Sequence, residues 1–215
     1  MRVVYYTKPF FLDCDLPYLY CQSKNVDSIL TFIDLPPHFL KSTVIDVTNR
    51  PKKPGIFNIN EYPELEHLSK YLDPEKTFII NRVSSKNYRL SNIILNFKLF
   101  FMIKNINPDI VHSTVFYDIP ELFLYYFKKV TILTVHDPFP HTGETSFRRS
   151  LFRRMSFKFI DNYVLLNKRQ KSKFIDKYKL SKKNIFDSEL GIYNILNDHL
   201  KEKSYGLYND YILFF

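Results

Sequence analysis

Residues 131–140 read TILTVHDPFP, a β-branched, apolar run that ends in His136, Asp137 and a proline. Short runs of this kind are typical of buried strands. Ionisable groups at the end of such a strand need a physical reason, because an apolar core offers them no partner. The stretch therefore indicates a strand whose carboxyl end faces something polar.

The same pattern recurs along the chain and predicts the fold class. Further strand-like runs lie at 2–6, 28–34, 77–80, 108–113, 162–167 and 184–190, and longer helical segments lie at 90–106, 119–129, 145–160 and 168–179. Strands that alternate with helices indicate βαβ units with right-handed crossovers. We therefore expect an α/β fold, a three-layer Rossmann-like domain with a mostly parallel sheet. Residues 35–68 interrupt the alternation and predict a long excursion with short edge strands.

Length and composition exclude several classes of protein. A chain of 215 residues suffices for one sizeable α/β domain or two small ones. Cys14 and Cys21 are too few for a disulfide scaffold, and their spacing does not suggest a metal site, so we expect neither metal nor cofactor. The sequence lacks a secretory leader and any apolar run long enough to span a bilayer. We expect a cytoplasmic protein that is at most peripheral to a membrane.

The positive charge is concentrated in one segment. Residues 148–183 hold 13 Lys and Arg against two acids, whereas the whole chain has a net charge of only +9. A basic flank of this kind is a candidate for phosphates, acidic lipid head groups or nucleic acid. A solvated face of two helices explains the same charges equally well, and the sequence leaves both interpretations open.

Polar residues gather where the predicted strands end. His112, His136 with Asp137, Asn167 and Glu189 each follow such a run. The carboxyl ends of parallel strands line the crevice in which doubly wound sheets bind ligands. A lone histidine at a strand end is more often structural, whereas a pair on consecutive strands supports a structural role and a binding site about equally.

At these residues the sequence resembles family 4 glycosyltransferases of the GT-B fold. The resemblance lies in PDIVHS (108–113), TILTVHDPFP (131–140), the Arg-rich RRSLFRRMSFKFIDNYVLLN (148–167) and ELGIYN (189–194). The positions that match the family pattern are His112, His136, Asp161, Asn167 and Gly191. The order and spacing of these elements carry the resemblance, and no single motif does.

The resemblance implies the N-terminal, acceptor-side half of a retaining enzyme that moves a sugar from a nucleotide-sugar donor to a glycan or lipid-linked acceptor. Residues 1–194 would form the acceptor-binding domain, and 195–215 the interdomain link with the first strand of a second domain. His136 would be the catalytic residue, through electrostatic stabilisation of the leaving diphosphate rather than as a nucleophile. His112, Asp137 and Asn167 would bind substrate. Because the donor-binding half would lie outside these 215 residues, we expect the chain alone to be inactive.

The segment after the first strand departs from the family pattern. Many relatives have a Gly-rich loop there, whereas this chain has TKPFFLDCDLP (7–17). Contact with the donor phosphate is therefore in doubt, and Phe10 and Phe11 become candidates for an aromatic wall that binds acceptor. Tyr5, Tyr6, Phe10 and Phe11 could all stack on sugar rings, although aromatic residues beside a first strand more often belong to the core.

A second interpretation is a stand-alone, non-catalytic domain that binds an anionic partner. In the transferase interpretation, Arg148, Arg149, Arg153 and Arg154 are candidates for contact with an anionic membrane surface or another anion, which would place the acceptor site near a membrane-embedded, lipid-linked sugar. Nucleic acid is not the expected partner, because no helix-turn-helix, zinc-finger or ribonucleoprotein motif accompanies the basic residues. The chain also lacks a P-loop, a G-x-S-x-G elbow and a G-x-G-x-x-G fingerprint.

Overall fold

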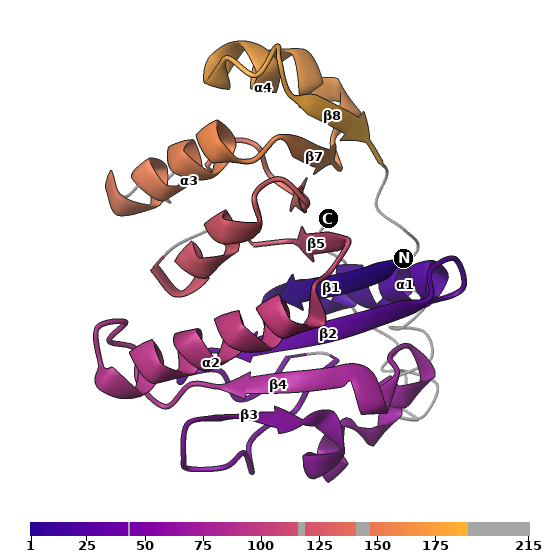
Figure 1. The fold of residues 1–215 in the computed structure, drawn as a ribbon, viewed down its shortest axis with the longest axis vertical. Helices are drawn as coiled ribbons and strands as arrows, with labels where there is room; N and C mark the ends of the chain where they lie inside the picture. The colour runs from indigo at the N-terminus through magenta and orange to yellow at the C-terminus, as the bar shows by residue number, and fades with distance from the viewer. Residues whose placement is uncertain (43, 116–118, 141–146, 189–215) are drawn as a thin grey trace, which may run out of the picture.

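The computed structural model describes residues 1–42, 44–115, 119–140 and 147–188, and it contains one eight-stranded sheet (Figure 1). The strands follow the order β3-β4-β2-β1-β5-β6-β7-β8, and all are parallel except β3, which pairs antiparallel with β4. Their bounds are β1 Arg2–Thr7, β2 Ser28–Leu35, β3 Gly55–Asn58, β4 Thr77–Asn81, β5 Ile110–Ser113, β6 Thr131–Val135, β7 Asn162–Leu165 and β8 Asn184–Asp187. The predicted α/β class with a mostly parallel sheet is confirmed.

Helices cover both faces of the sheet. The α-helices are α1 Leu12–Ser23, α2 Leu90–Ile106, α3 Phe147–Phe159 and α4 Lys171–Tyr178, and the 3₁₀ helices are η1 Pro9–Phe11, η2 Ile59–Glu61, η3 Pro63–Lys70, η4 Pro74–Lys76, η5 Ile119–Phe127 and η6 Lys168–Gln170. Helices α2, η5, α3 and α4 share one hydrophobic core with the sheet. Helix α1 and the excursion between β2 and β4 form a second core on the opposite face. The three-layer arrangement is thus confirmed.

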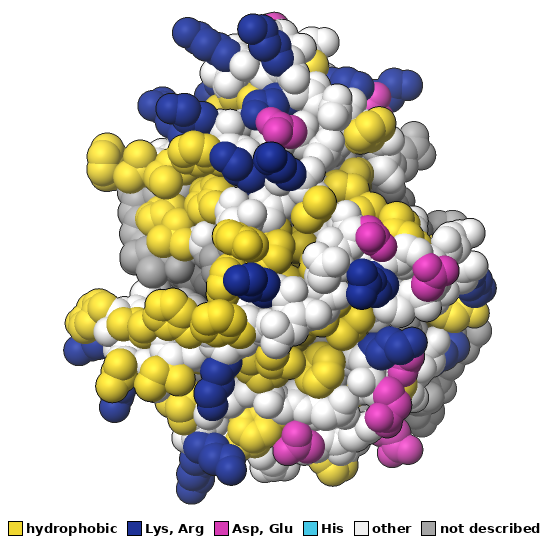
Figure 2. Space-filling model, in the orientation of Figure 1, with side chains coloured by type: hydrophobic (Ala, Val, Ile, Leu, Met, Phe, Trp, Pro, Cys, Tyr) yellow, Lys and Arg dark blue, Asp and Glu magenta, His cyan; other side chains and the backbone are white. Residues whose placement is uncertain are grey.

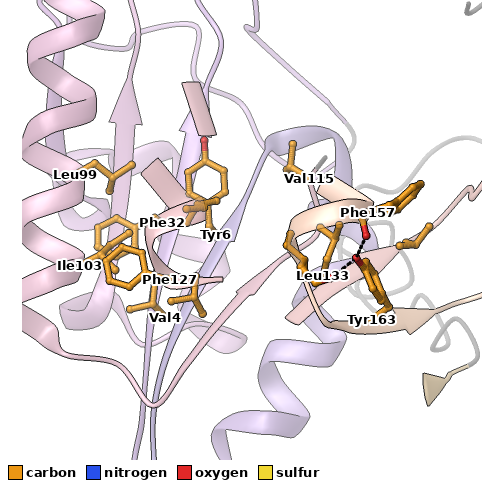
Figure 3. Packing of buried hydrophobic residues seen from close by; sticks show 14 of the residues in the cluster. Val4, Tyr6, Phe32, Leu99, Ile103, Val115, Phe127, Leu133, Phe157 and Tyr163 are labelled. Atoms are coloured by element: carbon orange, nitrogen blue, oxygen red, sulfur yellow. Dashed lines mark hydrogen bonds between the residues drawn. The ribbon is translucent and has the colours of Figure 1, made fainter. Parts of the chain in front are cut away.

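Alternation along β1 shows how the sequence builds the two cores. Val4 and Tyr6 point into the larger core, toward α2, and Tyr5 points into the smaller core, toward α1. Figure 3 shows Tyr6 among Phe32, Leu99 and their neighbours. Both tyrosines are buried, which supports their interpretation as core residues.

The predicted elements agree with the structure at most positions. Helix α2 spans the predicted 90–106, and each predicted strand-like run contains a strand. The segment 119–129 forms the 3₁₀ helix η5 rather than an α-helix. Burial of β8 was predicted wrongly, because it is the edge strand and three of its four residues are exposed.

Helix α1 is not predicted by the sequence pattern. The segment TKPFFLDCDLP (7–17) resembles a loop in sequence, whereas the chain turns into η1 at Pro9 and continues as α1 from Leu12. Pro17 lies inside this helix, although a proline in a helix normally removes a hydrogen bond and costs stability. Leu12, Leu16 and Leu19 repeat at helical spacing and are all buried, so packing on the sheet outweighs that cost.

Residues 35–68, between β2 and β4, form the long excursion that interrupts the alternation of strands and helices. The excursion contains the short edge strand β3, in agreement with the prediction, and also an isolated bridge between Lys41 and Asp46. Residues 189–215, with Glu189, Gly191 and the predicted link at 195–215, lie outside the described residues. Among the helices of the described part, none combines the length and apolar character needed to cross a bilayer.

Candidate functional site

The topology makes the carboxyl edge of the sheet between β1 and β5 the expected position of a ligand-binding crevice. These two strands are hydrogen-bonded neighbours, and β1 also pairs with β2 on its other side. The chain leaves β1 toward α1 on one face, whereas it leaves β5 toward η5 on the other. Connections that diverge in this way leave a crevice outside the strand ends, where open α/β sheets bind ligands.

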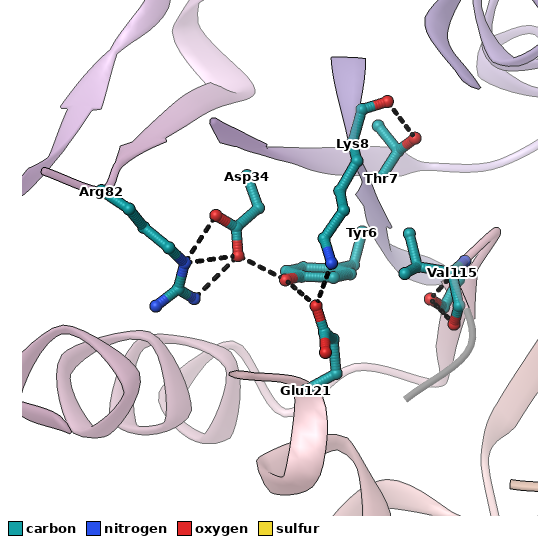
Figure 4. A network of polar contacts seen from close by, with 8 residues as sticks. Tyr6, Thr7, Lys8, Asp34, Arg82, Val115 and Glu121 are labelled. Carbon is teal, nitrogen blue, oxygen red and sulfur yellow. Dashed lines mark hydrogen bonds and ion pairs between the residues drawn. The ribbon is translucent and has the colours of Figure 1, made fainter. Parts of the chain in front are cut away.

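A buried network of charges supports this edge (Figure 4). Arg82, just after β4, forms a two-pronged ion pair with Asp34 of β2, with Nε 2.7 Å from Oδ1 and Nη2 2.7 Å from Oδ2. The Tyr6 hydroxyl donates to Asp34 Oδ2 at 2.5 Å and lies 3.4 Å from Glu121 Oε1. Lys8 Nζ pairs with Glu121 Oε1 at 2.5 Å. The network therefore ties β1, β2, β4 and η5 together.

The charges in this network compensate one another. Burial would raise the pKa of Asp34, but the Arg82 guanidinium outweighs burial and holds this pKa below its ordinary value. Burial would lower the pKa of Lys8, but Glu121 and Asp34 outweigh it and raise this pKa. Two carboxylates thus face two cations, which is the condition under which buried charges are tolerated.

One donor in the network stays open. Arg82 is almost fully buried, yet its Nη1 has no hydrogen-bond partner among the described residues. A buried donor of this kind costs free energy unless something accepts its hydrogen bond. The atom marks a place at the edge where an oxygen of a ligand or an ordered water fits.

His136 carries a second open nitrogen at the same edge. Its ring lies 5.0 Å from the ring of Phe11, centroid to centroid, and its Nε2 is buried without a partner in the described part of the chain. Burial lowers the pKa of His136, although Asp137 and Asp13 act in the opposite direction. The imidazole is therefore neutral near pH 7 and has a ring nitrogen available for a ligand.

His112, predicted to bind substrate, lies in the smaller core with both ring nitrogens engaged. Nε2 lies 2.6 Å from Thr134 Oγ1 and Nδ1 lies 3.2 Å from the Tyr18 hydroxyl. Burial lowers the pKa of His112 to about 3. A ligand would have to displace Thr134 or Tyr18 to reach this ring, so His112 holds β5, β6 and α1 in register around the edge.

Asp15 is a buried carboxyl that the sequence reading missed, since it lies in the unrecognised helix α1. Its Oδ2 accepts hydrogen bonds from Thr7 at 2.5 Å and Thr114 at 3.0 Å, at the ends of β1 and β5. Burial raises the pKa of Asp15 to about 7, against the lowering effect of these hydrogen bonds. The Leu12, Leu16, Leu19 spacing was the available signal, because it places Asp15 on the buried face.

The two phenylalanines after β1 point to different neighbours. Phe10 is exposed and makes an edge-to-face contact with Phe39, with ring centroids 5.5 Å apart. Phe11 is half-buried beside His136. Phe39 belongs to the smaller core and Phe11 packs against the larger one, so these two contacts lie on opposite faces of the sheet. The aromatic wall that would bind acceptor stays a prediction.

The remaining predicted residues lie farther along the edge or on its flank. Asp137 is exposed, and its backbone carbonyl accepts a hydrogen bond from Arg153 Nη1 at 3.3 Å. Asn167 is half-buried and precedes η6 without capping it through its side chain. The side chains of Arg148 and Arg149 lie outside the described residues.

A basic hollow lies between α3 and α4. It measures about 450 Å³ and is lined by Pro140, Ser150, Arg153, Arg154, Phe157, Lys158, Lys177, Tyr178 and Lys179. Five of these side chains are cationic and none is acidic. In the part of the chain that the structure describes, no group of three or more His, Cys, Asp or Glu could hold a metal ion.

The fold agrees with that of solved proteins of GT-B-like fold. UDP-N-acetylglucosamine 2-epimerase from Rickettsia bellii superposes with a TM-score of 0.54 at 12% identity, over 94% of this chain and 48% of that protein. UDP-GlcNAc 2-epimerase from Neisseria meningitidis, solved bound to UDP-GlcNAc, superposes with a TM-score of 0.57 at 8% identity, over 95% of this chain and 50% of that protein.

This likeness defines a class of fold. The chain has a Rossmann-like, GT-B-like fold and spans about half the length of the solved structures it matches. No family model and no curated protein matches the sequence. The resemblance to family 4 glycosyltransferases is thus confirmed for the GT-B-like fold and not for that family in particular.

Proposed function

We propose that this chain is the acceptor-side half of a sugar-nucleotide enzyme, a glycosyltransferase that transfers a sugar with retention to a glycan or lipid-linked acceptor. The observation that carries this function is His136, a neutral histidine with an open, buried Nε2 at the carboxyl edge of a GT-B-like half-domain. That one of the matched solved structures is bound to UDP-GlcNAc supports a nucleotide sugar as the donor class.

The role of His136 follows from its protonation state. A neutral imidazole with its proton on Nε2 donates one hydrogen bond, which stabilises negative charge that develops on a departing diphosphate. Because the neutral ring has no positive charge, it does not bind the intact donor as strongly as the departing diphosphate. The ring of Phe11 lies 5.0 Å from the imidazole, centroid to centroid, and burial lowers the pKa of His136 despite the opposite effect of Asp137 and Asp13, which keeps the ring neutral.

The acceptor would bind against the ring of Phe10. Phe10 is exposed at the crevice, and Phe39 supports its ring from the side. A flat aromatic surface beside a hydrogen-bonding edge suits a sugar, which presents apolar C–H faces and polar hydroxyl rims. The network of Lys8, Glu121 and Tyr6 fixes the segment that carries Phe10, since Lys8 is anchored to η5.

The test measures reaction products of the protein produced at its natural length, because the chain spans only half of the solved structures it matches. Nucleotide sugars are incubated with and without glycan or lipid-linked acceptors, and the nucleoside diphosphate and the sugars are separated by chromatography. We expect diphosphate release that depends on acceptor. The variant His136→Ala should lower kcat/KM by about 100-fold or more, as loss of one transition-state donor does.

His38→Ala is the matched control, because His38 is exposed in the segment after β2. Its activity should equal that of the unmodified protein. Conversion of UDP-GlcNAc to another sugar nucleotide in the absence of acceptor would contradict transferase activity. It would indicate epimerase activity, which is named for the matched solved structures. Turnover of no nucleotide sugar, or equal activity of both variants, would contradict the assignment of His136.

A further inference from the structure

We propose that the outer face formed by α2, η5 and α3 docks on a lipid bilayer that contains acidic phospholipids. This inference does not depend on the enzymatic activity, since it concerns a surface on the helical side of the sheet rather than the crevice. It also differs from the sequence expectation, which assigned membrane contact to four arginines and none to α2.

Helix α2 is apolar on both of its sides. Leu95, Leu99 and Ile103 fill the core against the sheet. The outer side carries Leu90, Ile94, Phe97 and Phe101, at intervals of four, three and four residues, and their side chains are 69, 46, 60 and 53% exposed. We refer to these four residues as the α2 stripe. A helix that is apolar all round is normally buried on all sides, so the stripe requires a covering partner.

The neighbouring elements extend the same apolar surface. Leu122 and Tyr126 of η5 and Phe147 and Leu151 of α3 are all exposed, and Phe147 is 86% exposed. Figure 2 shows hydrophobic side chains over α2 and over the start of α3 on the face toward the viewer. All three elements pack on the same side of the sheet, so their outer surfaces face the same direction.

The charge of this face selects the partner. Helices α2 and α3 contain no Asp or Glu, and the acid of η5, Glu121, is fully buried. Lys98 and Lys104 flank the α2 stripe, and the hollow lined by Arg153, Arg154 and Lys158 lies beside α3. Three helices that expose apolar and cationic side chains but no acid fit an interface with anionic lipid head groups.

A bilayer fits this face better than a second copy of the chain does. A symmetric dimer would bring the lysines and arginines of both copies together, and like charges at an interface oppose association. In a bilayer, by contrast, the stripe enters the boundary between head groups and acyl chains while the cations meet lipid phosphates. The hollow between α3 and α4 is large enough for such a phosphate group.

The experiment is vesicle co-sedimentation of the 215-residue chain at two lipid compositions. One vesicle contains phosphatidylcholine alone, and the other contains equal parts of phosphatidylcholine and phosphatidylglycerol. We expect binding to the acidic vesicles that weakens as salt is raised, and at least about tenfold weaker binding to the neutral vesicles, since several cations face the surface.

Two variants separate the stripe from general surface apolarity. Phe97→Ser with Phe101→Ser should lower the partition coefficient for acidic vesicles by at least about tenfold. Phe186→Ser is the matched control, because Phe186 is 60% exposed on the edge strand β8, away from this face. Far-UV circular dichroism verifies that each variant is folded.

Three outcomes would overturn the inference. Equal vesicle binding by the stripe variant and the control would show that the stripe does not insert. A dimer in light scattering that dissociates in the stripe variant, without vesicle binding, would assign the face to a second copy instead. Binding of labelled oligonucleotide in place of vesicles would assign it to nucleic acid.

Discussion

Replacing Asp15 by asparagine should stabilise the protein above neutral pH relative to the unmodified chain, by an amount that grows between pH 4 and pH 7. Asp15 is buried beneath the ends of β1 and β5, where Thr7 and Thr114 donate to its Oδ2. Asparagine has the same shape and keeps an oxygen for both hydroxyls. Its amide group can donate to the Tyr5 hydroxyl, which already bonds to Asp15.

The direction follows from proton linkage. Burial raises the pKa of Asp15 from its ordinary 3.8 to about 7, so the folded state retains a proton that the unfolded state has lost. The unfolded state therefore binds fewer protons between these two values, and the free energy of unfolding falls as pH rises through them. The stabilising contribution is complete below pH 4 and is lost by about pH 7.

The magnitude is the shift in pKa times about 1.36 kcal/mol per unit. For a shift of about three units, the unmodified chain loses about 4 kcal/mol between pH 4 and pH 7. An asparagine at this position does not titrate, so the difference in unfolding free energy between variant and unmodified chain should rise by about 4 kcal/mol over that range. This is a large share of the roughly 5–15 kcal/mol that stabilises a typical domain.

The assay is urea unfolding monitored by tyrosine fluorescence or circular dichroism at half-unit steps from pH 4 to pH 8. The test is how the difference in unfolding free energy between Asp15→Asn and the unmodified chain changes with pH. A difference that does not depend on pH reports only how well asparagine fits the site. A difference that stays constant over the whole range would refute a buried, protonated Asp15. Asp46→Asn is the control, since the side chain of Asp46 is 41% exposed and its pKa is lowered to about 2, below the range of the assay.

Three further predictions concern stability and follow from single contacts. Asp34→Asn leaves the buried Arg82 without its counter-charge and should lower the unfolding free energy by about 3–5 kcal/mol, measured by urea unfolding. His112→Gln should lower the free energy of unfolding least in acid. Burial holds the pKa of His112 near 3, so the unfolding free energy of the unmodified chain itself falls by about 1.4 kcal/mol per pH unit below 6.5. Leu99→Ala should cost about 2–5 kcal/mol in thermal or urea unfolding, whereas Phe97→Ala on the exposed side of the same helix should stay within about 0.5 kcal/mol.

The strand and helix pattern was predictable because it depends on local spacing. Helix α2 is bounded by Arg89 in an extended conformation and by Asn107 in the left-handed conformation, and the sequence shows both ends as changes of composition. Helix α1 was not predictable by the same rule, since Pro17 argues against a helix and only contact with the sheet outweighs it. Exposure of the α2 stripe likewise depends on tertiary packing, because periodicity does not say which apolar side meets the sheet.

The candidate site was predictable only in part, for a related reason. The strand ends place His136 at the carboxyl edge as expected. They do not reveal that His112, one strand away, turns into the smaller core and bonds to Tyr18, because Tyr18 belongs to the unrecognised helix. The Arg82 and Asp34 pair escaped notice for another reason: the two residues are 48 positions apart and meet only through sheet order.

The two proposed surfaces adjoin, and this gives a last prediction. Helices α2 and α3 both begin at the carboxyl edge of the sheet, where His136 lies, so a bilayer against their outer face would lie beside the crevice. A lipid-linked acceptor would then reach the crevice without leaving the membrane. In the protein of natural length, the variant Phe97→Ser with Phe101→Ser should therefore lower the ratio of activity on a lipid-linked acceptor in vesicles to activity on a water-soluble analogue.

We expect that ratio to fall by about tenfold, the same factor as the loss of vesicle binding, because the membrane concentrates enzyme and acceptor on one surface. Phe186→Ser should leave the ratio unchanged, since its side chain is exposed on β8 rather than on the α2 face. A stripe variant that loses vesicle binding but keeps the ratio would show that docking and acceptor delivery are separate. Because the ratio cancels any uniform loss of active protein, a destabilised variant cannot imitate the expected result.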